Sequence, residues 1–134
     1  MKKEPISLVV LLKAQKRFLA FSTRLDDEQL QTGAIKAFEY SYELAWKTMK
    51  KFVERDLSER VQGSRDAFRG AARLGLIDNP DLWFDFTDER NLCSHAYDDD
   101  IAANILSIFP VFTEELQKFI DRAKAHDTRR ATTL

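Results

Sequence analysis

The longest regular pattern in the sequence is a seam of apolar residues that predicts a helix from about residue 28 to residue 56. Its members recur at steps of three and four: Ile35, Phe38, Tyr42, Ala45, Met49 and Phe52. This spacing keeps them on one side of an α-helix and is the kind of seam by which helices pack in bundles. Glycine and proline are few, and long alternating runs of β-branched residues are absent, so the sequence predicts an all-helical protein.

Shorter patterns indicate the other helices of the first half. Apolar residues one heptad apart predict a first helix over residues 6–23. Ser64 is suited to cap a short helix that ends near Arg73, and Gly75 fits the left-handed position after it. The expected fold is an antiparallel, up-and-down four-helix bundle with this short helix added.

Two further long helices are expected in the second half. Pro80 suits the first position of a helix that continues to about Ala96. The acidic run at residues 98–100 then suits the positive end of a last helix over residues 101–126, and capping explains this run better than metal binding. Pro110 lies inside the last helix, where we expect it to cause a kink.

Length and composition favour one domain. The 134 residues indicate a single domain over residues 1–126, followed by a flexible polar tail at residues 127–134. A single cysteine and the absence of a recognisable leader or membrane span predict a cytoplasmic protein. Because 21 basic residues nearly balance 22 acidic ones, any contact with nucleic acid must be local.

The residues most suited to chemistry lie close together near residue 95. Arg90 carries a permanent charge and a planar set of donors that fits phosphate oxygens, and His95 can transfer protons near neutral pH. Asn91 either holds a phosphate oxygen or fixes His95, or it is a surface amide. Tyr97 is either packed with one hydrogen bond or available for modification. Cys93 is expected to be a buried small apolar residue.

Two carboxylates on the long second helix are candidate partners for Arg90. Glu39 and Glu43 are like charges one turn apart, which is unfavourable unless a cationic side chain pairs with them. Either Arg90 pairs with them and is oriented for a phosphate, or Lys47 alone balances Glu43 on the surface. The sequence leaves both arrangements open. It shows no spacing typical of a metal site, and no cofactor is expected.

The string Arg90-Asn91-x-x-x-His95-x-Tyr97 resembles the signature of HEPN-domain proteins. It is most similar to the branch paired with a minimal nucleotidyltransferase, described either as a substrate-binding subunit or as the HepT-type toxin. Other stretches resemble landmarks of that branch in the same order: residues 38–47, 67–68, 75–77 and Trp83. Together they cover about residues 30–98.

The resemblance implies two functions. In the first, the chain is a metal-independent endoribonuclease toxin, with Arg90 and His95 as catalytic residues in the cleft of a homodimer or higher oligomer. A cognate nucleotidyltransferase neutralises it and modifies Tyr97 with AMP. In the second, the chain is a non-catalytic subunit that binds a substrate or nucleotide for that enzyme. A helical adaptor without a ligand is a third, less favoured interpretation.

The spacing of Arg90 and His95 poses a geometric problem. On a regular helix, five residues correspond to a rotation of about 500°, which leaves the two side chains about 140° apart and about 7.5 Å apart along the axis. They would not share a face. Either the helix loosens near Cys93 and Ser94, or the two side chains reach one cleft from different sides with a second copy completing it.

Overall fold

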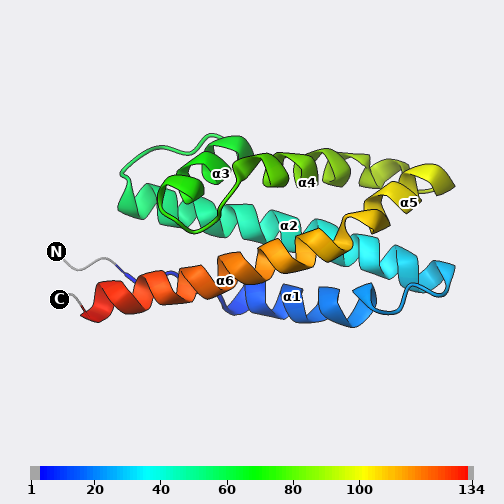
Figure 1. Ribbon diagram of the computed structural model, residues 1–134, viewed down its shortest axis with the longest axis horizontal. Coiled ribbons are helices and arrows are strands. Elements are labelled where there is room, and N and C mark those ends of the chain that lie inside the picture. The colour runs from blue at the N-terminus through cyan, green and yellow to red at the C-terminus, as the bar shows by residue number, and fades with distance from the viewer. Residues whose placement is uncertain (1–3, 133–134) are drawn as a thin grey trace.

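The computed structural model describes residues 4–132, which form helices joined by short connections (Figure 1). The helices are α1 (Val9–Ser22), α2 (Glu28–Asp56), α3 (Ser64–Arg73), α4 (Pro80–Leu92), the 3-10 turn η1 (Cys93–His95), α5 (Asp99–Ser107) and α6 (Phe109–Thr132). The prediction of an all-helical protein is confirmed. The second helix begins and ends where the apolar seam indicated.

Four long segments run side by side along the molecule. Figure 1 shows α1 and α6 on one side of α2, and α3 and α4 on the other, with both chain ends at the same end of the bundle. The short helix α3 packs on α2, whereas α5 lies at the far end and connects α4 to α6. The expected four-helix arrangement with an additional short helix is therefore present, and a second short helix, α5, is added.

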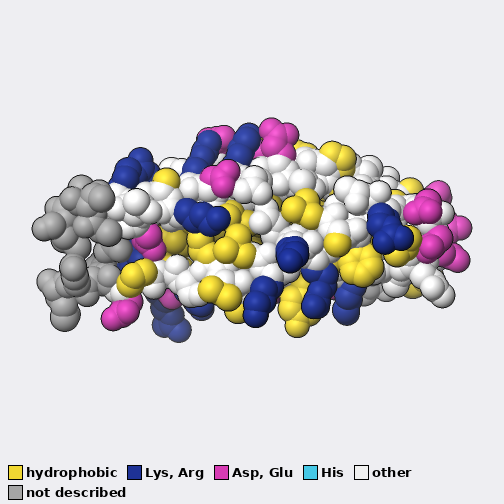
Figure 2. Space-filling model, turned by 90° about the horizontal axis from the view of Figure 1, so that it is seen from below, with side chains coloured by type: hydrophobic (Ala, Val, Ile, Leu, Met, Phe, Trp, Pro, Cys, Tyr) yellow, Lys and Arg dark blue, Asp and Glu magenta, His cyan; other side chains and the backbone are white. Residues whose placement is uncertain are grey.

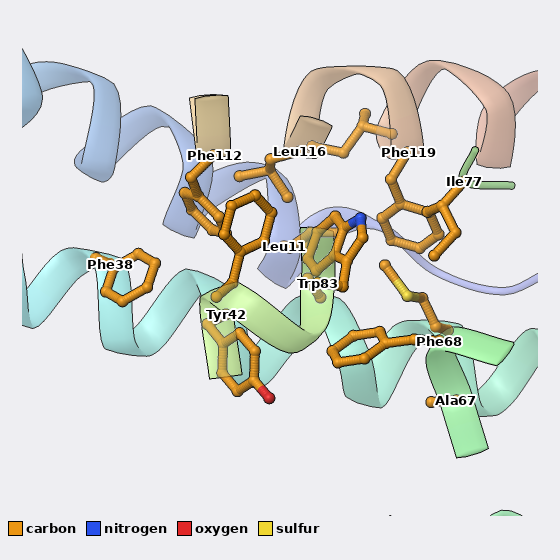
Figure 3. Close-up of a cluster of buried hydrophobic side chains, with 14 of the residues drawn as sticks. Leu11, Phe38, Tyr42, Ala67, Phe68, Ile77, Trp83, Phe112, Leu116 and Phe119 are labelled. Carbon is orange, nitrogen blue, oxygen red and sulfur yellow. The ribbon is translucent and has the colours of Figure 1, made fainter. Parts of the chain in front are cut away.

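The core is centred on an aromatic residue of α6. The ring of Phe112 meets Phe18 of α1, Phe38 of α2 and Phe86 of α4 edge to face, with centroids 4.9–5.3 Å apart. All four side chains are almost completely buried. Figure 3 shows Phe112 above Phe38, with Trp83 beside them. Edge-to-face contacts of this kind stabilise the packing beyond the burial of apolar area, so one ring ties four helices together.

Local signals place several helix ends as expected. Gly75 adopts a φ of 76°, the left-handed conformation that favours glycine. Asn79 accepts a hydrogen bond from the backbone N–H of Asp81, and Pro80 opens α4. Asp98 caps α5 in the same way. One expectation is wrong in detail: Ser64 is the first residue of α3, and Gly63 occupies the cap position.

The last helix is interrupted rather than kinked. The expected continuous helix over residues 101–126 is two helices, and α5 ends at Ser107 before α6 begins at Phe109. Pro110 is thus the second residue of α6, where a backbone N–H has no partner within the helix and its loss costs no hydrogen bond. The prediction of a kink inside one helix was wrong because proline starts a new helix here.

The helix α6 also extends beyond the expected polar tail. It continues to Thr132, so residues 127–132 are helical where a flexible polar tail was expected. Asp127 accepts a hydrogen bond from Arg55 of α2 at 2.6 Å and another from the backbone N–H of Ile6 at 3.0 Å. These contacts hold the helix end against the bundle. The tail residues 133 and 134 lie outside the described part.

Basic side chains are frequent on one long face of the molecule. Figure 2 shows them along this face together with some acidic side chains, and a cluster of acidic side chains at the end away from the termini. On α1, Lys13, Lys16 and Arg17 are exposed, and the helix contains no acidic residue. The near-zero net charge of the chain therefore does not prevent local regions of basic or acidic surface. Among residues 4–132, no helix is long and apolar enough to cross a membrane.

Candidate functional site

Arg90 lies in the last turn of α4 and reaches across to α2. Its Nη2 is 2.7 Å from Glu43 Oε1, and the two side chains are 37% and 29% exposed. The Nε of Arg90 is buried without a hydrogen-bond partner among the described residues. The guanidinium group is therefore fixed on one edge, with part of its surface open to an incoming anion.

Glu43 is itself held on both oxygens. Its Oε2 accepts a hydrogen bond from Trp46 Nε1 at 3.1 Å, and Lys47 Nζ lies 3.8 Å from the same oxygen. Of the two arrangements left open by the sequence, the pair with Arg90 is therefore present for Glu43, and Lys47 adds a longer contact but does not balance Glu43 alone. The short contact is the one to Arg90, so the main effect of Glu43 is to orient that side chain.

Glu39 takes a different position from Glu43. No ion pair joins it to Arg90, and it faces Cys93 at the end of α4 instead. Burial raises the pKa of the Cys93 thiol to about 12, and the nearby Glu39 carboxylate adds to the rise. Cys93 is buried, as expected, and such a thiol is protonated and unreactive at neutral pH. It is not a candidate nucleophile.

Asn91 is exposed beside Arg90. Its Oδ1 lies 3.5 Å from Arg90 Nη1, at the outer limit of a hydrogen bond. No hydrogen bond joins Asn91 to His95, so in this chain the amide does not fix the imidazole. Its position is compatible with contact to a phosphate held by Arg90.

The backbone changes geometry between Arg90 and His95. The α-helix ends at Leu92, and residues 93–95 form a 3-10 turn. A 3-10 turn rotates by about 120° per residue, so the total rotation is about 560° and leaves the two side chains about 160° apart. The helix therefore tightens near Cys93 and Ser94, where loosening was one expectation, and this change does not bring Arg90 and His95 to one face. No hydrogen bond or ring contact joins them.

His95 and Tyr97 lie together after the turn. Their ring centroids are 6.3 Å apart with an interplanar angle of 63°. Both side chains are exposed, and Tyr97 is 85% accessible, which is unusual for an aromatic side chain. Of the two interpretations of Tyr97, packing in the core is excluded. Its phenol oxygen is available to a reagent or enzyme.

A groove of about 960 Å³ runs between the first half of α2 and the segment formed by η1 and α5. It is lined by Glu28, Gln29, Gln31, Thr32, Gly33, Ile35, Lys36, Glu39, Cys93, Ala96, Tyr97, Asp99 and Ala102. Sequence reasoning found only Glu39 and Tyr97 here as site residues. The spacing of Thr32, Lys36 and Glu39 places them on one side of α2, and this was the sequence signal for the groove. Only the packing of η1 and α5 shows that these elements form the other wall of the groove.

The aromatic and acidic residues near the site differ in burial. Trp83 is fully buried and cannot stack on a ligand, whereas Trp46 is half-buried beside Glu43. Glu89, next to Arg90, has one carboxylate oxygen buried without a partner, and burial together with Asp88 raises its pKa. Within residues 4–132 no three His, Cys, Asp or Glu side chains are grouped to hold a metal ion.

Comparisons with known proteins agree with this fold. The family model described as nucleotidyltransferase substrate binding protein like matches residues 8–125. A probable ribonuclease HepT of Haemophilus influenzae is 32% identical over 101 residues, which cover 72% of this chain and 69% of that protein. The match therefore includes most of both chains.

Two solved structures have the same fold. One, from Haemophilus influenzae, is described as revealing the fold of a substrate binding domain of a nucleotidyltransferase. It has a TM-score of 0.80 and 28% identity, and covers 88% of this chain and 99% of that chain. The other, a protein from Thermus thermophilus, has a TM-score of 0.79 and 22% identity, with coverage of 84% and 98%. The second likeness concerns the fold alone.

Proposed function

The chain belongs to the family of nucleotidyltransferase substrate-binding-like proteins and is a homologue of HepT ribonucleases. From this premise, we propose that it is a cytoplasmic, metal-independent endoribonuclease toxin. Arg90 and His95 are its catalytic residues, and its active form is a homodimer. A cognate nucleotidyltransferase is its antitoxin. The proposal rests on the residues at the end of α4 and on the likeness to the Haemophilus ribonuclease.

The observation that carries the proposal is the divergence of two chemically suited side chains, the half-buried Arg90 and the exposed His95. Arg90 is held toward α2 by Glu43, whereas His95, five residues further along the helix and the 3-10 turn, lies about 160° away around the axis. Within a single chain, Arg90 and His95 therefore each supply one half of a catalytic site, on different sides of the helix. A two-fold symmetric dimer joins the Arg90 of one subunit to the His95 of the other and produces two equivalent sites.

The chemistry follows from the two side chains. The 2′-hydroxyl of RNA attacks the adjacent phosphorus, a new O2′–P bond forms, and the P–O5′ bond breaks to leave a cyclic phosphate and a 5′-hydroxyl. His95 transfers the proton that leaves the 2′-hydroxyl or that the 5′-oxygen acquires. Arg90 stabilises the charge that develops on the phosphorane oxygens, as fixed cationic donors do. Asn91 contacts a phosphate oxygen beside it.

Tyr97 is the proposed site of neutralisation. Its exposed phenol oxygen attacks the α-phosphorus of ATP in the partner nucleotidyltransferase, so that an AMP ester forms and pyrophosphate leaves. The added phosphate lies near His95, since the two rings are 6.3 Å apart. A covalent anion at this position competes with RNA phosphates for the same cations.

A second function is favoured by a different observation. The Haemophilus structure with 28% identity is described as a substrate binding domain of a nucleotidyltransferase, and the groove beside α2 is large enough to hold a small molecule. In this alternative, the chain presents a substrate or a nucleotide to its partner enzyme and performs no chemistry of its own.

Mixing two inactive variants tests the catalytic proposal. Arg90→Ala and His95→Ala each remove RNA cleavage in buffer containing a chelator. When the two are refolded together, half of the dimers are mixed, and one of the two sites in each mixed dimer has both residues intact. Activity therefore returns to about one quarter of the wild-type value if the site is shared across a symmetric interface.

The outcomes separate the two functions. Wild-type protein that leaves RNA intact and does not slow growth contradicts the toxin proposal and favours the substrate-binding alternative. Cleavage that both single variants retain contradicts the assigned residues. Cleavage that the variants lose but their mixture does not restore contradicts the shared site. Exposed Lys51→Ala, on the opposite part of α2, is the control for the mutational procedure.

A further inference from the structure

The groove beside α2 has features that the proposed chemistry does not use. We propose that it is a binding site for a nucleobase that carries an exocyclic amino group, so that adenine, cytosine or guanine binds in preference to uracil. This inference rests on the proposed function in one respect, because it names the part of the nucleotide substrate that lies next to the phosphate at Arg90.

The shape and lining of the groove suit a flat ring. Ile35, Ala96 and Ala102 supply an apolar surface between α2 and α5. Tyr97 stands at the same groove with most of its ring open to solvent. Aromatic side chains in such positions stack on bases of any sequence, since each base has a π-face. An apolar floor with one exposed ring is therefore a suitable stacking site.

The polar groups of the lining favour hydrogen-bond donors in the ligand. Glu28, Glu39 and Asp99 are among the residues that line the groove, and no hydrogen bond or ion pair joins their carboxylates to the described residues. Among the described residues that line the groove, Lys36 is the one cation. Since carboxylates outnumber cations, a phosphate inside the groove is disfavoured. Carboxylates accept hydrogen bonds from exocyclic amino groups of bases, which uracil lacks.

The phosphate of the same nucleotide has a site nearby. Cys93, the first residue of η1, lines the groove and lies about one turn after Arg90. On α2, Glu39 of the groove lies one turn before Glu43, which holds Arg90 at 2.7 Å. One turn is about 5.4 Å along a helix, so a base in the groove places its own phosphate within reach of the guanidinium group. The base of the nucleotide thus lies in the groove, and its phosphate lies at Arg90.

Titration with mononucleotides tests the inference without any cleavage. AMP, CMP, GMP and UMP carry the same phosphate, so differences among them report on the base. Calorimetry with the full-length protein is expected to show at least fivefold weaker binding of UMP. Ala102→Phe fills the groove and is expected to weaken AMP binding at least tenfold, whereas Ala103→Phe, exposed and outside the lining, leaves it unchanged.

Tyr97 provides a second test on an exposed residue that does not endanger folding. Tyr97→Ala removes the stacking surface and weakens AMP binding, whereas Tyr97→Phe keeps the ring and binds as the wild type does. Tyr97→Phe also lacks the phenol oxygen, so its behaviour separates stacking from modification. Equal affinity for all four nucleotides, no binding at millimolar concentration, or displacement of AMP by spermidine from the groove each overturns the inference.

Cleavage of RNA is measured separately on the same proteins. If the wild type cleaves RNA and Ala102→Phe binds and cleaves as well as Ala103→Phe, the proposed function stands and the nucleobase site is refuted. If the wild type does not cleave RNA but binds AMP in a manner that Ala102→Phe abolishes, the nucleobase site stands and the ribonuclease proposal is refuted.

Discussion

Replacing Glu43 by glutamine tests whether the contact with Arg90 orients the guanidinium group. The substitution keeps the size of the side chain and removes its charge. The pair is short, at 2.7 Å, and about one third of each side chain is exposed, so it lies between a surface pair and a buried one. Exposed pairs contribute about 0.2–1 kcal/mol, and we expect Glu43→Gln to cost about 1 kcal/mol of unfolding free energy.

The assay is thermal unfolding followed by circular dichroism. For a domain of this size, 1 kcal/mol corresponds to a decrease in Tm of about 4 °C. A double-mutant cycle with Arg90→Ala isolates the pair, and we expect a coupling free energy of about 0.5–1 kcal/mol. RNA cleavage should decrease on the order of tenfold in Glu43→Gln, since a misplaced catalytic group loses much of its effect.

The matched control is Glu114→Gln on α6. Its carboxylate lies 3.5 Å from Lys118 Nζ and is 68% exposed, so it is also an acidic partner in a helical ion pair, but at an ordinary surface position. We expect a change within about 0.5 kcal/mol and unaltered cleavage. Equal stability and equal cleavage of the two variants would refute the orienting role of Glu43.

Three further substitutions or measurements test the packing and the titrating groups. Gly70→Ala places a methyl group 2.5 Å from Val53 Cγ2, so urea unfolding should show a loss of about 1–3 kcal/mol, and adding Val53→Ala should restore most of it. Glu89→Gln should raise Tm at pH 7. Burial raises the pKa of Glu89 above 4.5, so the protonated side chain favours folding below pH 4.5 and this stabilisation is lost as pH rises. The increase in Tm caused by Glu89→Gln should therefore disappear by pH 4. Cys93, with a pKa of about 12, should resist alkylation by iodoacetamide at pH 8 until urea unfolds the chain; rapid labelling of folded protein would contradict this assignment.

Local sequence patterns were sufficient for the elements that depend on neighbouring residues. The seam of α2 predicted a helix of 29 residues with the observed ends, because a three-four repeat of apolar residues is compatible with one conformation only. Asp27 caps this helix by accepting a hydrogen bond from the backbone N–H of Leu30, as an acidic residue before a helix is expected to do. Gly75 and Pro80 could also be interpreted locally, because glycine tolerates the left-handed conformation and proline suits the first turn of a helix.

Elements that depend on distant residues were missed. The extension of α6 past residue 126 depends on Arg55, which lies 72 positions earlier in the chain and binds Asp127. The break at Ile108 could not be distinguished from a kink, because proline is compatible with either a kinked helix or the first turn of a new one. Both outcomes are decided by what the flanking residues pack against.

The candidate site divides in the same way. The amino-acid sequence by itself determined which side chains have the chemistry, since the guanidinium group of Arg90, the imidazole of His95 and the phenol of Tyr97 belong to the residues. Only the tertiary structure decided that Arg90 pairs with Glu43, that His95 points elsewhere, and that a groove forms beside α2. The physical reason is that orientation and enclosure arise from contacts between helices far apart in the chain, which local periodicity does not encode.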